Sequence, residues 1–360
     1  MSTDISQQLQ SQILEAYKNS TPLCITGGNS KAFYGLPVEA TPLDVSQHSG
    51  VLNYEPTELV ITARAGSRLA DIEKLLDENG QMLPFEPPAF AESATLGGTI
   101  ACNLSGPRRA YAGAARDFLL GCKIINGKGE ILSFGGEVMK NVAGYDVSRL
   151  MAGAMGTLGV LLEVSLKVLP KPETELTQQL TCTVDQALDR LHAWSQTPMP
   201  ITASSYHDNQ LHIRLSGAGN AVAAAVQNMG GKTLDNAAAY WHNLKEQSLA
   251  FFEGDEALWR LSIASDTPAN LFNALDDTRI LYEWGGALRW LKGNISEEQI
   301  LNIARDAGGH ATLFRAGANM SDNRPAFQSL PNELLPIHRN LKQAFDPNGI
   351  LNPGRLHPEL

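Results

Sequence analysis

The sequence predicts an α+β protein of two domains. The chain has 360 residues, which suits two domains at roughly 150 residues each. Helix-like and strand-like segments alternate in the second half without a strict βαβ rhythm, a pattern typical of α+β folds. Glycine-rich clusters occupy the first half and stop before Pro170-Lys171-Pro172. We therefore expect a domain boundary at this proline-rich segment.

The first 80 residues predict two helices and two strands. Residues 5–18 carry apolar side chains on one helical face, and a short strand follows over residues 22–26. A second strand is expected over residues 59–65. Ser67 occupies the position of a helix N-cap, and the helix that follows it would end at Gly80.

The next 90 residues predict a loop, a hairpin and a strand. Small residues and prolines dominate residues 84–115, so we expect an extended loop with one short helix. Residues 118–134 predict a β-hairpin with Asn126-Gly127-Lys128-Gly129 as its turn. Residues 146–162 mix helix and turn signals, and a strand is expected over residues 164–169.

The second half predicts alternating helices and strands and carries no internal repeat. The expected helices are residues 185–194, 220–229, 236–251 and 296–307. The expected strands are residues 211–215, 258–263 and 311–315.

The charge balance narrows the choice of partners. The chain has 28 basic and 38 acidic residues, a net charge of −10. A nucleic-acid partner would need a basic stripe, and anionic lipid would repel this balance. We therefore expect no nucleic acid, and a membrane only indirectly through partner subunits.

The cysteines and the N-terminus indicate a reducing compartment and no metal. Cys24, Cys102, Cys122 and Cys182 are far apart, so neither zinc nor an iron–sulfur cluster is suggested, and we expect small buried side chains. The N-terminal segment lacks the basic start and apolar run of a secretion signal. We expect a cytoplasmic chain, or a peripheral one on the cytoplasmic face of the inner membrane.

The first glycine cluster is Ile25-Thr26-Gly27-Gly28-Asn29-Ser30-Lys31, directly after a strand. Glycine lets the backbone approach a ligand closely, and successive N–H groups in such a turn form a nest for an anion. A tight turn explains a Gly-Gly pair equally well, so this cluster alone leaves both interpretations open. Its spacing is not that of the G-x-x-x-x-G-K-[ST] phosphate loop.

Two further clusters follow. The second is Ser93-Ala94-Thr95-Leu96-Gly97-Gly98-Thr99-Ile100-Ala101-Cys102-Asn103-Leu104-Ser105-Gly106, which is small, polar and uncharged, as a wall against a flat polar cofactor would be. A buried glycine-rich crossing of two elements is the alternative. The third comprises Lys140-Asn141-Val142-Ala143-Gly144-Tyr145-Asp146 and Gly153-Ala154-Met155-Gly156-Thr157-Leu158-Gly159-Val160.

Taken together and in this order, the clusters resemble the FAD-binding domain of the vanillyl-alcohol oxidase and p-cresol methylhydroxylase (PCMH) superfamily. The segment Phe345-Asp346-Pro347-Asn348-Gly349-Ile350-Leu351-Asn352-Pro353-Gly354-Arg355 is similar to the closing motif of its FAD-linked oxidase branch. The resemblance covers residues 20–170 and 340–356 well and the middle loosely. It implies a two-subdomain PCMH-type FAD-binding domain over residues 1–170, a small α+β cap domain over residues 171–335, and a segment 336–360 that returns to the FAD domain.

The resemblance also implies which residues bind FAD. These are Thr26, Gly27, Gly28, Asn29, Ser30, Ser93, Ala94, Thr95, Gly97, Gly98, Ala101, Asn103, Gly106, Gly144, Tyr145, Gly156, Gly159 and Val160. Relatives with covalent flavin often carry a histidine in the first loop. Here Asn29, Ser30 and Lys31 stand there, so non-covalent FAD is expected.

Within the superfamily, the length and the Lys140–Asp146 run look most like the FAD-binding subunit of glycolate oxidase (glycolate dehydrogenase). That family pairs this subunit with a larger homologous FAD subunit and an iron–sulfur subunit. The resemblance implies oxidation of glycolate, a small 2-hydroxy acid, to glyoxylate, with electron transfer through FAD.

Catalysis is less well marked. Hydroxy-acid oxidation needs a base, a cation for the carboxylate and flavin N5 to receive the hydride. Catalytic relatives carry an H-x-G-D-G-N-x-H type segment that this sequence lacks, and Gly308-Gly309-His310-Ala311-Thr312 is its nearest match. His310 and Arg315 are the catalytic candidates, with Arg289 as another cation. A structural or surface role is the alternative for His310.

Other polar and aromatic residues can be explained by structural roles. His207 and His212 are expected at the surface of a turn and a strand, and Trp241, Trp284 and Trp290 in the core or an interface. Arg108 and Arg109 would meet the pyrophosphate or stay solvated.

Three roles remain open. The chain relays electrons between flavin and partner, oxidises the hydroxy acid itself, or is a structural partner that has lost the cofactor. The absence of bulky or charged side chains from residues 94–106 argues against the third. The closing motif disfavours a reductase of cell-wall precursor synthesis, which shares the fold.

Overall fold

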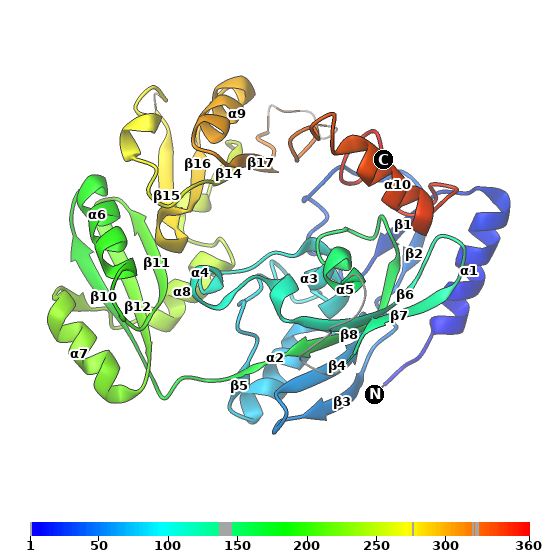
Figure 1. Ribbon diagram of the computed structural model, residues 1–360, viewed down its shortest axis with the longest axis horizontal. Helices are drawn as coiled ribbons and strands as arrows, with labels where there is room; N and C mark the ends of the chain where they lie inside the picture. The colour runs from blue at the N-terminus through cyan, green and yellow to red at the C-terminus, as the bar shows by residue number, and fades with distance from the viewer. Residues whose placement is uncertain (1, 137–145, 276, 319, 321–323) are drawn as a thin grey trace. The chain divides into compact units, whose positions relative to one another are not determined.

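The computed structural model describes residues 2–136, 146–275, 277–318, 320 and 324–360 (Figure 1). The chain divides into two compact units. Unit 1 comprises residues 1–105, 114–170 and 329–360, and unit 2 comprises residues 106–113 and 171–328. The division after Pro170 falls at the expected position. The terminal segment joins unit 1 from residue 329 rather than 336, and residues 106–113 belong to unit 2 instead of the first domain.

Unit 1 is built on a five-stranded antiparallel sheet with the order β3-β4-β8-β6-β7. Its strands are β3 (Val51–Glu55), β4 (Val60–Arg64), β6 (Leu119–Ile125), β7 (Ile131–Gly135) and β8 (Val160–Lys167). The predicted hairpin is confirmed. The side-chain oxygen of Asn126 closes its turn by accepting from the N–H groups of Lys128 and Glu130, each at 3.0 Å.

Two strand pairs and five α-helices complete unit 1. Strand β1 (Leu23–Thr26) runs parallel to β2 (Thr41–Asp44), and β5 (Gln81–Met82) pairs with β9 (Leu169–Pro170). The helices are α1 (Ser6–Asn19), α2 (Leu69–Glu78), α3 (Leu96–Cys102), α5 (Val147–Met151) and α10 (Leu335–Phe345), with a 3₁₀ turn over Ala115–Asp117.

Strands β2 and β3 lie where no strand was expected, and two further local predictions in unit 1 are wrong. Arg68, not Ser67, is the N-cap of α2, because the Ser67 hydroxyl instead accepts a hydrogen bond from the N–H of Gly50 at 2.9 Å. Strand β8 begins at Val160, four residues before the expected start. Its side chains are largely buried on both faces, so the run reads as continuously apolar and gives no alternation to mark its beginning.

Unit 2 contains one eight-stranded antiparallel sheet with the order β13-β10-β12-β11-β15-β16-β14-β17. Its strands are β10 (Thr174–Thr181), β11 (Ile201–His207), β12 (Gln210–Gly217), β13 (Lys232–Thr233), β14 (Leu258–Ser262), β15 (Arg279–Glu283), β16 (Leu288–Lys292) and β17 (His310–Arg315). Its helices are α4 (Arg109–Ala112), α6 (Val184–Ser195), α7 (Gly219–Met229), α8 (Ala237–Lys245) and α9 (Glu297–Asp306), with 3₁₀ turns at Ala250–Phe252, Ala269–Phe272 and Trp284–Gly286.

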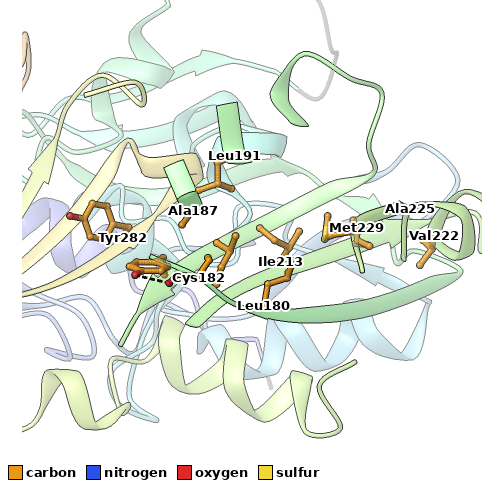
Figure 2. Packing of buried hydrophobic residues seen from close by; sticks show 12 residues of the cluster. Leu180, Cys182, Ala187, Leu191, Ile213, Val222, Ala225, Met229 and Tyr282 are labelled. Atoms are coloured by element: carbon orange, nitrogen blue, oxygen red, sulfur yellow. Dashed lines mark hydrogen bonds between the residues drawn. The ribbon is translucent and has the colours of Figure 1, made fainter. Parts of the chain in front are cut away.

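One face of this sheet is apolar and covered by helices. Figure 2 shows Leu180 and Ile213 of the strands, with Cys182 just after β10, packed with α6 and α7, and Tyr282 at one end of the cluster. A second cluster joins strands β14, β16 and β17 to the buried Ile300 and Ala304 of α9.

The opposite face of the sheet, which we call the polar face, carries a row of mainly polar residues beside buried Leu281 and Trp290. The pairing registers align residues from six strands in one row that crosses it. Because neighbours across strands point to the same face, the row lies on the side away from the two apolar clusters. Its members are His212, Ser205, Glu283, Leu288, Ser262 and His310.

Within the described part of the chain, no helix has the length and apolar character needed to cross a lipid bilayer.

Candidate functional site

Unit 1 contains a pocket of about 980 Å³, the open solvent at its mouth included. The loop after β1, helix α3, the turn after α5 and the C-terminal segment form its walls. Its lining residues are Cys24, Ile25, Thr26, Gly27, Gly28, Asn29, Ser30, Lys31, Ala32, Val38, Val45, Ala65, Thr95, Gly97, Gly98, Ala101, Cys102, Met151, Ala154, Met155, Gly156, Gly159, Leu161, Asn352 and Arg355.

The loop after β1 offers the pocket a row of backbone donors. Among the hydrogen bonds of the described residues, none is donated by the backbone N–H groups of residues 27–30. Asn29 has φ = 55°, the left-handed conformation that turns successive N–H groups inward in an anion nest. The half-buried loop therefore presents unused donors to a ligand in the pocket.

Two cations contribute to the same pocket. Lys31 is buried, and its Nζ lies 3.3 Å from the Ser30 hydroxyl and 3.2 Å from the Ala89 carbonyl. Arg355 donates to the Leu36 carbonyl at 2.7 Å, and burial lowers the pKa of its guanidinium. Two positive charges beside a nest of N–H groups favour an anionic ligand such as a diphosphate.

Helix α3 forms a wall without large side chains. The Thr95 hydroxyl caps it by accepting from the Gly98 N–H at 3.2 Å. A Cβ at Gly97 would lie 2.6 Å from the Cβ of Ala65, so this glycine permits close packing of α3 on β4. A Cβ at Gly98 would meet only the Thr95 hydroxyl, at 3.1 Å. Gly98 therefore keeps space open, whereas Gly97 fills a contact within the protein.

Gly28 also serves a contact within the protein. A Cβ there would overlap the carbonyl group of Ser93, and the Ser93 hydroxyl donates to the Gly28 carbonyl at 2.6 Å. The loop after β1 and the segment before α3 are thus fastened to each other, and together they line the pocket.

The C-terminal segment (red in Figure 1) contributes Asn352 and Arg355 to the lining of the pocket. Leu351 forms a parallel bridge with Leu23. The Asn352 side chain accepts from the Ile25 N–H at 2.7 Å and donates to the Met155 carbonyl at 2.6 Å. One side chain therefore joins the loop after β1 to the turn after α5.

A buried ion pair holds this segment in place. Lys342 lies 2.8 Å from the carboxylate of Asp346, which is fully buried, and donates to the carbonyls of Thr157 and Leu351. The same carboxylate accepts from the N–H groups of Ile350 and Leu351. The closing motif is thus a structural clamp around the pocket.

Eleven of the predicted cofactor residues line the pocket, five described ones do not, and two lie outside the described residues. The eleven are Thr26, Gly27, Gly28, Asn29, Ser30, Thr95, Gly97, Gly98, Ala101, Gly156 and Gly159. Ser93, Ala94, Asn103 and Val160 stand outside the lining, Gly106 belongs to unit 2, and Gly144 and Tyr145 lie outside the described residues. Asn103 instead ends α3 in a left-handed conformation, and its side chain accepts from the Arg116 N–H.

The sequence reasoning missed several pocket residues. Lys31 and Arg355 stand within the motifs without a predicted role, although a cation beside a glycine turn is a usable signal. Cys24 and Cys102 were expected as small buried side chains, yet both are only half-buried and line the pocket. Burial raises the pKa of the Cys102 thiol, which keeps it protonated.

The two catalytic candidates are not brought together. His310 and Arg315 begin and end β17, about 17 Å apart along the strand. The structure therefore does not place them around one small substrate. Arg289 is fully buried, donates to the carbonyls of Gly286 and Thr267, and serves the interior of unit 2.

Other predictions for unit 2 also need correction. His212 is buried, not at the surface, and desolvation lowers its pKa to about 4. Arg108 is neither solvated nor part of the pocket, since it forms a 2.8 Å ion pair with Glu175. Arg109 stacks on the ring of Trp284. Trp241, Trp284 and Trp290 are buried, as expected.

Comparison with known proteins agrees with the interpretation of this pocket as a cofactor site. Residues 5–135 match the family model of the FAD binding domain, and residues 326–356 match the C-terminal domain of FAD linked oxidases. The chain is 49% identical to glycolate oxidase subunit GlcE of Escherichia coli (strain K12), over 99% of both chains. It is 35% identical to glycolate oxidase subunit GlcD of Bacillus subtilis (strain 168), over 35% of this chain and 27% of that protein.

A similar architecture occurs in a solved structure. Alkyldihydroxyacetonephosphate synthase superposes with a TM-score of 0.68 at 16% identity, covering 96% of this chain and 74% of the synthase. At this identity the likeness establishes the fold alone.

Fold and pocket define the class: this is an FAD-dependent oxidoreductase of the FAD-linked oxidase type, with a PCMH-type FAD-binding domain. Within that class, the chain belongs to the family of glycolate oxidase subunit GlcE. The predicted fold class, cofactor and family are confirmed.

Proposed function

We propose that the chain is the FAD-binding subunit of a glycolate oxidase complex and takes part in oxidising glycolate to glyoxylate. The observation that carries the proposal is the pocket of unit 1, where a nest of unused N–H groups lies beside Lys31 and Arg355. The relative that matches from end to end is named as a glycolate oxidase subunit.

The chain's own residues bind and orient the flavin. When bound, FAD supplies the acceptor for the hydride and passes electrons on. The nest over residues 27–30 and the two cations fit the diphosphate, and the small side chains of α3 fit a flat ring system. Attachment is non-covalent in this proposal, because the first loop has no histidine.

Electron relay is the first role of this subunit. In this role the chain's residues would hold an FAD that exchanges electrons with a larger homologous FAD subunit and an iron–sulfur subunit, and those partners would make any membrane contact. Oxidation of the hydroxy acid by this chain itself is the second candidate, favoured by the cationic residues of unit 2 described below.

An anaerobic visible spectrum of the purified chain, before and after glycolate, tests the proposal. We expect a flavin spectrum that dithionite reduces. Bleaching by glycolate alone would assign substrate oxidation to this chain, and no bleaching would favour relay. A chain that stays colourless after incubation with FAD would overturn the proposal.

Co-purification tests the partners. A tag on this chain should retain a second flavoprotein and a subunit with iron–sulfur absorbance. Recovery of the tagged chain alone from cells that express the complete complex would contradict the proposed assembly.

A further inference from the structure

The polar face of the sheet in unit 2 carries a cluster of two arginines, a tryptophan and a histidine. The guanidinium carbon of Arg109 lies 4.4 Å from the ring centroid of Trp284, and that of Arg260 lies 5.1 Å from it. Two like charges thus share one aromatic ring, at most about 10 Å from each other. We call Arg109, Arg260, Trp284 and His310 the arginine–tryptophan cluster.

The strand register places His310 beside Arg260. Arg260 pairs with Thr312, and Ser262 pairs with His310, so Arg260 and His310 are diagonal neighbours on one face. Their strand neighbours Trp259 and Ala311 belong to the apolar cluster on the opposite face. The alternation of the strand therefore directs both polar side chains away from the core.

Trp284 is held in a fixed and strained position. It has φ = 54°, followed by Gly285 at 66° and Gly286 at 95°. Its Nε1 donates to the Gly106 carbonyl at 3.1 Å, and its side chain is buried. A bulky residue in the left-handed region costs of order 1–3 kcal/mol and persists only where its surroundings over-determine it. The ring is thus a rigid platform for the two guanidinium groups.

The charges that act on His310 are both positive. Desolvation lowers the pKa of the imidazole, and Arg260 and Arg109 lower it further. At neutral pH the ring is therefore neutral and able to accept a proton. The cluster combines cations suited to a carboxylate with a group suited to a base.

We propose that the arginine–tryptophan cluster binds the carboxylate of a small 2-hydroxy acid, with Arg109 and Arg260 as its ligands and Trp284 as the platform that orients them. This inference rests on the proposed function for the choice of acid. Arg109 and Arg260 take the role expected of Arg315, because Arg315 lies at the opposite end of its strand from His310. Thr312, buried and paired with Arg260, supplies a neighbouring hydroxyl.

Equilibrium binding of oxalate, a non-oxidisable analogue, to the full FAD-loaded chain tests the proposal. Calorimetry should detect binding to the wild type, and neutral glycolamide should not bind. Arg260→Gln and Arg109→Gln should each weaken oxalate binding at least about tenfold, since charge-assisted hydrogen bonds are lost. Arg260→Lys keeps the charge but not the fork, and should lose less than Arg260→Gln.

Arg305→Gln is the matched control, because it removes an exposed charge from α9 and should leave oxalate affinity unchanged. The proposal is overturned if the wild type binds no oxalate, or if the variants at positions 109 and 260 bind it as the wild type does. The flavin content of each preparation reports separately on the proposed function. A chain without FAD can still be titrated with oxalate, so the two failures are distinguishable.

Discussion

The pocket of unit 1 and the polar face of unit 2 are formed by different kinds of chemical group. The pocket uses backbone N–H groups, glycines and small side chains, with only two cations. The polar face uses long side chains brought into register by strands that are far apart in sequence, such as β14 and β17. A site made of backbone groups can be recognised from a local sequence motif, whereas a site made of side chains from distant strands cannot.

The two sites also differ in what a single substitution removes. In the pocket, several glycines serve contacts between loops, so a side chain there disturbs the walls themselves. On the polar face, an arginine can be replaced without moving the backbone. Variants should therefore separate folding from binding more cleanly in unit 2 than in unit 1.

The largest effect is expected at Gly28. Gly28→Asp should leave unit 1 unfolded or insoluble, because the new side chain overlaps the Ser93 carbonyl. Gly98→Glu should fold but carry no FAD, since its side chain has space in the pocket and brings a negative charge to it. Far-ultraviolet circular dichroism and the ratio of flavin absorbance to protein measure both.

Gly219→Ala is the control for these two variants, because Gly219 in α7 has only ordinary contacts at 3.4 Å or more. It should match the wild type in both measurements. A Gly28→Asp protein with full flavin content would contradict the loop packing described for unit 1.

A smaller effect is expected at the clamp. Lys342→Met leaves the buried Asp346 carboxylate without its cation and should lower the free energy of unfolding by about 3 kcal/mol. Urea denaturation measures the change. Lys74→Met, which removes an exposed i,i+4 pair with Glu78, should change it by less than about 0.5 kcal/mol. Equal losses of unfolding free energy in the two variants would mean that the buried ion pair stabilises the protein no more than an exposed pair does.

The smallest effect concerns pH and unit 2. The folded pKa of His212, about 4, lies below the unfolded value of 6.5, so the unfolded state binds the proton more readily. The contribution of neutral His212 to the free energy of unfolding is therefore fully present above pH 6.5, and it is lost as the pH is lowered towards 4. His212→Phe keeps the stacking on Tyr240 and should reduce this loss by about 2 kcal/mol. An unchanged pH profile of urea unfolding would refute the assignment.

The sequence predicted the FAD-binding half well, for a physical reason. Turns such as Gly27-Gly28 and Asn126-Gly127 need particular residues at adjacent positions, so their signals survive in a single sequence. The hairpin β6–β7 and the loop after β1 were predicted on such signals, and helix α1 was predicted from its apolar face.

The second half was predicted less completely. Strands β10, β11, β13, β15 and β16 and helix α10 were missed. Strand β11 carries the sequence Ile-Thr-Ala-Ser-Ser-Tyr-His, in which polar residues are buried beneath α8, so no apolar alternation marks it. Tertiary contacts, and not local pattern, stabilise such strands.

Contacts that depend on tertiary structure left no local signal in the site predictions either. Arg260 received no role, because only the register of β14 against β17 brings it to His310. Residues such as Ser93 were assigned to the ligand although they fasten the loop that meets it. A motif in one sequence cannot distinguish residues that contact the ligand from residues that hold the loop in place.

The bond between Asn352 and Ile25 has a consequence for the order of events on the ribosome. The two residues are 327 positions apart, with all of the second unit between them. At about 5–20 residues per second, tens of seconds separate their synthesis. Until the later segment emerges, the strand that precedes the glycine loop lacks its neighbour, and the flavin cavity stays open on one side. We therefore expect a nascent polypeptide to bind the vitamin-derived cofactor only after its translation has passed Asn352.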